Sequence, residues 1–262
     1  MRDTGVLTGL TTPATPDARP RGRVLAGTSG FAYPGWAPVF YPAGAPAAGL
    51  LPHYAARLSA CELSTTYYAR PTPQRIDTWA AAVPASFRFM VKAQRGTAVR
   101  ALATDPVGSG ARLVEHLERF GERLGGVLFR VAPGTARSDD RLTALLAAWP
   151  RTMPLVLEAQ EPAWHVDETF AALRAVGAVL CTTDSDEGDD LPDIRRTGPF
   201  LYLRLRRTEY DDAALDAWAA RLAPFVADGM DAYVMFRHDE MGITALQAEA
   251  FAGRVEHVLA AS

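Results

Sequence analysis

Short apolar runs alternate along the chain with segments whose apolar residues recur at helical spacing. We predict strands at 24–30, 61–65, 87–93, 126–131, 155–158, 178–184, 200–206 and 232–239. Helices are predicted between them, for example where Leu215, Trp218 and Leu222 share one face, and where Leu113 to Phe120 form another that Gly121 closes. The strands follow one another at roughly 25–35 residues, which is the length of a βα unit.

Eight βα units in one chain of 262 residues predict a single (β/α)8 TIM-type barrel over residues 23–262. The alternative is a doubly wound open sheet. Such sheets usually have fewer strands and a glycine-rich phosphate turn, which this sequence lacks. Residues 1–22 are rich in Thr, Pro and Arg and have no apolar core, so we predict a disordered arm ahead of the barrel.

Composition narrows the class of protein. An apolar share of 48% with 22% charged residues is typical of a globular domain, and no apolar run reaches the roughly 18 residues of a membrane span. A net charge of -3 argues against a protein that coats nucleic acid. Cys61 and Cys181 lie in apolar runs without a CxxC motif, so we expect reduced core thiols in a cytoplasmic protein without a membrane partner.

Polar and charged residues recur where the predicted strands end. They are Ser29, Glu62, Lys92, Arg130, Glu158, Asp184, Arg204, Arg206, Arg237 and His238. The carboxyl ends of the strands of a barrel converge on one mouth, where the active sites of this fold lie. Buried charges cost free energy unless they are matched, so their recurrence favours a working site over a structural network.

The charges at this mouth indicate the substrate class. Lys92 and four arginines outnumber the three carboxylates by two, and arginine forks suit carboxylates and phosphates. We therefore expect a small anionic substrate. Its predicted binding residues are Ser29, Tyr33, Arg130, Asp184, Tyr202, Arg204, Arg206, Arg237 and His238.

Proton transfer is assigned to Glu62, Lys92 and Glu158. Lys92 is the only lysine in the chain. Burial can lower the pKa of such an amine and make it a base, a nucleophile or an anion anchor. A structural ion pair is the alternative.

Two other functions stay open. Glu62, Glu158, Asp184 and His238 could bind a divalent metal, as in a metal-dependent phosphoesterase, but the sequence has no HxH or HExxH and the arginines would repel a cation. We predict no cofactor. The arginines of the arm and the mouth could instead serve a nucleic-acid-binding module without catalysis, whose binding would depend steeply on salt. The sequence does not specify an oligomeric state.

Several motifs together resemble the YecE-like family, domain of unknown function 72, over about residues 27–250. They are Gly27-Thr28-Ser29-Gly30 with Tyr33 and Trp36, Phe40-Tyr41-Pro42, Glu62 followed by Ser64 to Tyr68, Val91-Lys92-Ala93, Leu128-Phe129 with Pro133, Glu158 with Pro162 and Trp164, Tyr202 with Arg204, and Phe236 with Gly242 and Ala245. The resemblance implies a TIM-type barrel and supplies no activity. A link to metal-dependent endonuclease barrels rests on analogy of fold.

The departures from the family pattern fall at polar positions. Ser64 replaces an Asn, Arg130 a Gln, Gln160-Glu161 an Arg-His, Arg206-Arg207 a His-Gly, and Arg237-His238 an Asn-Asn. The framework positions match the family pattern. The polar positions at the mouth differ from that pattern, mostly because they carry arginine. The resemblance therefore identifies a divergent member, with family chemistry carried over only at Glu62, Lys92, Glu158 and Arg204.

Overall fold

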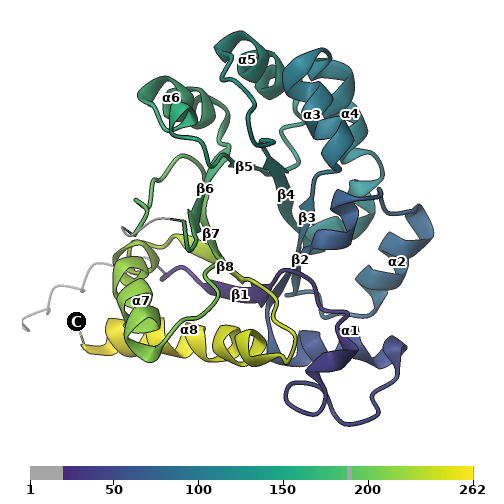
Figure 1. Ribbon diagram of the computed structural model, residues 1–262, viewed down its shortest axis with the longest axis vertical. Coiled ribbons are helices and arrows are strands. Elements are labelled where there is room, and N and C mark those ends of the chain that lie inside the picture. The colour runs from purple at the N-terminus through teal and green to yellow at the C-terminus, as the bar shows by residue number, and fades with distance from the viewer. Residues whose placement is uncertain (1–19, 188–190, 262) are drawn as a thin grey trace, which may run out of the picture.

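The computed structural model, which describes residues 20–187 and 191–261, is a barrel of parallel strands with helices outside it (Figure 1). The strands are β1 (Val24–Thr28), β2 (Ala60–Leu63), β3 (Arg88–Lys92), β4 (Leu124–Arg130), β5 (Leu155–Glu158), β6 (Val179–Asp184), β7 (Phe200–Leu205) and β8 (Asp231–Phe236). They pair in the order β1-β8-β7-β6-β5-β4-β3-β2. The predicted single (β/α)8 barrel is confirmed.

Helices cover the outer face of the strands, as Figure 1 shows. The α-helices are α1 (Ala47–Arg57), α2 (Pro73–Ala81), α3 (Arg95–Ala103), α4 (Pro106–Val114), α5 (Asp139–Ala148), α6 (Asp167–Val176), α7 (Asp212–Ala227) and α8 (Ile243–Ala261), and the 3-10 helices are η1 (Pro34–Trp36), η2 (Ser64–Tyr67), η3 (Leu117–Arg123) and η4 (Pro162–Trp164). Thr72 caps α2 by accepting a hydrogen bond from the Arg75 amide, as a Thr before Pro at the first helical position predicts.

The barrel closes at a seam between β1 and β2. Only an isolated bridge between Ser29 and Glu62 pairs these strands, and both residues belong to the predicted site. Tyr54 of α1 supplies other hydrogen bonds there: its hydroxyl accepts from the Thr28 amide at 2.8 Å and donates to the Ala60 carbonyl at 3.0 Å. A β-carbon on Gly27 would lie 1.9 Å from that carbonyl oxygen, so glycine is required for the close approach.

The two-residue period of the strands places charges above an apolar floor inside the barrel. Ala60, Met90, Leu128 and Val156 belong to the inner apolar cluster, and each is followed two residues later by Glu62, Lys92, Arg130 and Glu158 in turn. In β7 the inward Tyr202 is likewise followed by Arg204, while Leu201 and Leu203 pack outward, as the alternation predicts. Four neighbouring strands thus each carry a charge into the mouth, and Arg130 and Glu158 are direct register partners.

Three local predictions need correction. The strand predicted at 61–65 ends at Leu63, because residues 64–67 turn into η2. The single helix predicted around 113–120 is wrong: α4 ends at Val114, and His116 takes a left-handed φ of 69° before η3 begins. Helix α3 was not predicted, because alanines make up much of its buried face and give a weak apolar period.

Residues 1–19 of the predicted arm, together with residues 188–190, lie outside the described residues. Residue 22 is described, and its amide donates a hydrogen bond to the Val226 carbonyl at 2.8 Å. Within the described residues, no helix combines the length and apolarity needed to cross a bilayer.

Candidate functional site

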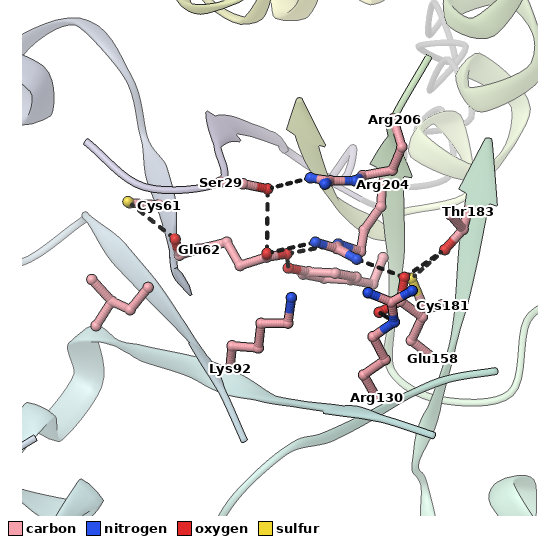
Figure 2. A network of polar contacts seen from close by, with 12 residues as sticks. Ser29, Cys61, Glu62, Lys92, Arg130, Glu158, Cys181, Thr183, Arg204 and Arg206 are labelled. Atoms are coloured by element: carbon pink, nitrogen blue, oxygen red, sulfur yellow. Dashed lines mark hydrogen bonds and ion pairs between the residues drawn. The ribbon is translucent and has the colours of Figure 1, made fainter. Parts of the chain in front are cut away.

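A buried ion pair between Glu62 and Arg204 lies at the centre of the mouth, the end of the barrel where the strands terminate (Figure 2). Arg204 Nε donates to Glu62 Oε2 at 2.9 Å, and Nη2 donates to Oε1 at 2.8 Å. The exposed fraction is 2% for the Arg204 side chain and 0% for the Glu62 side chain. This two-pronged contact suits the planar guanidinium and fixes both side chains across the barrel.

The same guanidinium also binds Glu158. Arg204 Nη1 donates to Glu158 Oε1 at 2.6 Å, so each of its three nitrogens donates to a carboxylate. Thr183 Oγ1 donates to the same Glu158 oxygen at 3.2 Å. Arg204 is therefore engaged with protein carboxylates, and this geometry favours a positioning role over the direct anion contact that the sequence predicts for it.

One oxygen of Glu158 remains available. Oε2 is buried and accepts no hydrogen bond from the described residues, and the neighbouring Arg130 Nε likewise donates none. The two atoms lie 3.6 Å apart, as an ion pair without a hydrogen bond. Arg130 Nη2 donates to Gln160 Oε1 at 2.6 Å. Buried polar atoms usually have partners, so these two atoms are available to a ligand that enters the mouth.

Glu62 differs from Glu158 in that both its oxygens are occupied. Tyr202 donates its hydroxyl proton to Oε2 at 2.9 Å, and Ser29 Oγ donates to Oε1 at 3.2 Å. Although burial alone would raise the pKa of Glu62, the positive charges of Arg204 and Lys92 lower it to about 2. Glu62 is therefore ionised at neutral pH, and this favours an anchoring role over proton transfer.

Arg206 lies two residues beyond Arg204, just after the end of β7, and its side chain faces the mouth. Its Nη1 donates to Ser29 Oγ at 2.9 Å. Burial and the positive charge of Arg204 lower the pKa of Arg206. Within the described part of the chain, Arg206 has no carboxylate within ion-pair distance. Its charge is only partly compensated by the protein.

Lys92 is a second cation of the mouth that forms no ion pair with a described residue. Figure 2 shows its side chain rising from β3 towards the Glu62–Arg204 pair. Nζ lies 4.5 Å from the centre of the Tyr67 ring and has neither a hydrogen bond nor an ion pair with any described residue. Burial and Arg204 lower the pKa of Lys92 to about 8, although Glu62 and Glu158 act in the opposite direction. Near neutral pH its amine can both hold and release a proton.

Three predicted residues make no hydrogen bond or ion pair to this cluster among the described residues. Asp184 is 1% exposed and accepts hydrogen bonds from Arg207 at 2.7 Å, Tyr210 at 2.8 Å and Trp218 at 2.9 Å, so it ties β6 to α7 on the outside of the barrel. Arg237 is exposed, and His238 stacks on Tyr33 with ring centres 4.8 Å apart. These two residues lie beyond the end of β8.

Tyr33 and Ser29 are joined at the seam, where the Tyr33 hydroxyl donates to the Ser29 carbonyl at 2.8 Å. Residues missed by the sequence analysis are Thr183, Gln160 and Tyr67. The alternation of β6 points to Thr183, because Cys181 is inward and Thr183 follows two residues later. Gln160 follows β5 in a loop and Tyr67 lies in the short helix η2, and neither segment is long enough for periodicity to give a signal.

A cavity of about 440 Å³ adjoins the charged cluster at the ends of β5 and β6. Its described lining includes Gln160 and Thr183, which contact Arg130 and Glu158, together with His165 and Arg195. A cavity of this size accommodates a small molecule.

The donor groups at the mouth offer no evident metal cage. Among residues 20–187 and 191–261, no three His, Cys, Asp or Glu side chains gather in a way that could hold an ion. Glu62 and Glu158 are both held by Arg204. Burial raises the pKa of the Cys61 and Cys181 thiols, which are free and buried.

Comparisons with known proteins agree on one family. A family model described as a protein of unknown function, DUF72, matches residues 25–261. A crystal structure of a DUF72 family protein from Thermotoga maritima is similar, with 24% identity, a TM-score of 0.76, and coverage of 89% of this chain and 99% of that chain. One from Enterococcus faecalis has 17% identity, a TM-score of 0.67, and coverage of 92% and 99%. These structures show the fold. No curated protein matches the chain.

Proposed function

The chain belongs to the DUF72, or YecE-like, family of proteins of unknown function, and from the geometry of its mouth we propose that it is an enzyme that acts by acid–base chemistry on a small anionic substrate. The substrate carries a phosphate or a carboxylate group. Binding and proton transfer both take place where the strands end, as in other enzymes of this fold.

The charge balance of the cluster is the observation that carries the proposal. Four cations, namely Lys92, Arg130, Arg204 and Arg206, surround only two carboxylates, Glu62 and Glu158. Arg204 binds both carboxylates, which leaves one negative charge against the three positive charges of Lys92, Arg130 and Arg206, so the cluster carries a net charge of +2. Uncompensated charge that is partly buried is costly. A bound anion would relieve this cost.

The donors that remain available define an anion site. Arg206 uses one described hydrogen bond, to Ser29. Lys92 uses none, and Arg130 Nε is buried without an acceptor among the described residues. Charge-assisted hydrogen bonds from such groups to phosphate or carboxylate oxygens are short and strong. Lys92 and Arg206 thus hold the anion in this proposal, and Arg130 holds its far side.

Two groups are suited to move protons. The pKa of Lys92, about 8, gives its amine both protonation states at neutral pH. Glu158 Oε2 has no donor among the described residues, so it is free to accept a proton from the substrate. Glu62, Tyr202 and Arg204 form the frame that keeps Glu158 in place.

Titration of the protein with inorganic phosphate, followed by calorimetry, tests the proposal. We expect saturable binding to wild type and a loss of about tenfold in affinity for Lys92→Met, because one charge-assisted contact is removed. Arg174→Met is the matched control, since Arg174 lies exposed in the last turn of α6 at the other end of the barrel. Equal affinity of wild type and Lys92→Met, or no binding at all, would contradict the proposal.

The two free thiols also support a cytoplasmic location, because reduced cysteines persist in a reducing compartment. This location is part of the proposal.

A further inference from the structure

Lys92 is a chemical exception in this chain. Lysine and arginine together number 27, and Lys92 is the only lysine among them. A guanidinium at this position would supply the same charge permanently. An amine differs because it loses its proton and becomes a nucleophile. The chain therefore places its one nucleophilic amine side chain at the mouth.

The surroundings of Lys92 leave this amine free to react. The side chain is 8% exposed, and Nζ lies over the Tyr67 ring at 4.5 Å. The two carboxylates of the mouth are both engaged by Arg204, and no described carboxylate lies within 4.0 Å of Nζ. Its one contact with an aromatic ring leaves the lone pair of the neutral amine without a hydrogen-bond partner among the described residues. Burial also lowers the pKa of the amine, which increases its neutral fraction.

We propose that Lys92 forms an imine with a ketone or aldehyde group of the anionic substrate. This inference rests on the proposed function, because the anion site brings the carbonyl group to the amine. The substrate class is thereby narrowed to small anions that carry a carbonyl group.

The reaction is a condensation that needs no oxidant or reductant. The lone pair of Nζ forms a bond to the carbonyl carbon, and the C=O π electrons move to the oxygen. That oxygen takes up one proton from Nζ and one from a neighbouring acid, and it leaves as water. The product is an iminium ion that carries the positive charge that the ammonium carried before.

The cluster suits each part of this step. Because the charge at residue 92 is unchanged in the product, its balance with Glu62 and Glu158 is kept. Arg206 remains available for the anionic group of the substrate. The free oxygen of Glu158 can exchange the protons that the condensation requires. An iminium carbon withdraws electrons from its neighbours and so eases the loss of an adjacent proton.

Reductive trapping of the full-length protein tests the inference. Protein is incubated with glyoxylate and cyanoborohydride, and the carboxymethylated residues are mapped by mass spectrometry. The α-amino group of the chain is an internal reference, since α-amino groups of polypeptides ordinarily have a pKa close to 8. Acetaldehyde, which has the aldehyde without the anion, is the matched probe. We expect the ratio of Lys92 to α-amino labelling to be about tenfold higher with glyoxylate, as one anion contact predicts.

Two results separate this inference from the proposed function. Lys92→Arg has no amine that can condense with a carbonyl group, so it should lose the label at residue 92 while its α-amino group is labelled as in wild type. If wild type binds phosphate but Lys92 is labelled no more than the α-amino group with either probe, the imine is excluded and the anion site stands. If wild type binds no phosphate, the proposed function fails first, and preferential labelling by glyoxylate should be absent too.

Discussion

Arg204 and Glu62, which are 142 residues apart in the sequence, form a two-pronged ion pair across the interior of the barrel. The pair joins β7 to β2 next to the seam, where the strands themselves make only one bridge. Since Arg204 also binds Glu158 on β5, one guanidinium links three strands. The mouth thus has a rigid inner frame, and around it lie cations that the protein does not neutralise.

Replacement of Arg204 by Met should destabilise the fold. Glu62 and Glu158 would lose their buried counter-charge, and the expected loss is about 3–5 kcal/mol in the free energy of unfolding. Urea unfolding at pH 7 measures it. A loss below about 1 kcal/mol for Arg204→Met would show that Glu62 and Glu158 do not depend on Arg204 for their counter-charge.

Glu62 should make stability fall at acid pH. Its pKa is about 2 in the folded protein and 4.5 as an ordinary side chain. The stability that its ionised form contributes is therefore complete above pH 4.5 and is lost as the pH falls towards 2. Urea unfolding of wild type and Glu62→Gln across this range should give a difference that shrinks as the pH falls.

Asp77→Asn is the control for this pH series, because Asp77 is an exposed carboxylate that pairs with Arg119. Its difference from wild type should be much smaller across the same range. A difference for Glu62→Gln that does not change with pH would contradict the assignment.

Arg206 should contribute to anion binding more than Arg237 does. Arg206 faces the cluster beside Ser29, whereas Arg237 is exposed and donates only to Thr208 at 3.4 Å among the described residues. We expect Arg206→Met to raise the Kd for phosphate about tenfold, and Arg237→Met to change it less than about threefold. Calorimetry at two salt concentrations makes the comparison. Equal effects of the two substitutions would place the anion at the rim rather than inside the mouth.

Asp184 should matter for stability and not for binding. Its oxygens accept from Arg207, Tyr210 and Trp218. Asp184→Asn should cost about 1–3 kcal/mol in unfolding free energy, since a buried charge-assisted network is weakened. The phosphate Kd should stay within about twofold of wild type. If Asp184→Asn were as stable as wild type but no longer bound phosphate, Asp184 would be part of the anion site.

The sequence predicts the barrel well because each strand is long enough to show its own pattern. The same pattern brings Glu62, Lys92, Glu158 and Arg204 to one place, since each lies two residues beyond an inward apolar residue. It misplaces Asp184 because the last residue of a strand was taken for the inward one, although Thr183 has the inward parity.

The roles within the cluster could not be read from the sequence. Whether Arg204 meets a substrate or two glutamates depends on how β7 is staggered against β2 and β5, and strand patterns do not encode that distance. The sequence also does not indicate the break between α4 and η3. The residue with the left-handed backbone there is His116, whereas glycine is the residue that usually marks such a break.

Titration of the single lysine side chain by NMR tests the central claim most directly. Protein labelled with 13C and 15N in lysine gives one side-chain signal, because Lys92 is the only lysine. We predict a midpoint near pH 8, and an upward shift of this midpoint when inorganic phosphate saturates the protein, since a bound anion favours the ammonium form. A midpoint at the ordinary value of 10.5 that phosphate does not move would contradict an uncompensated amine in an anion site.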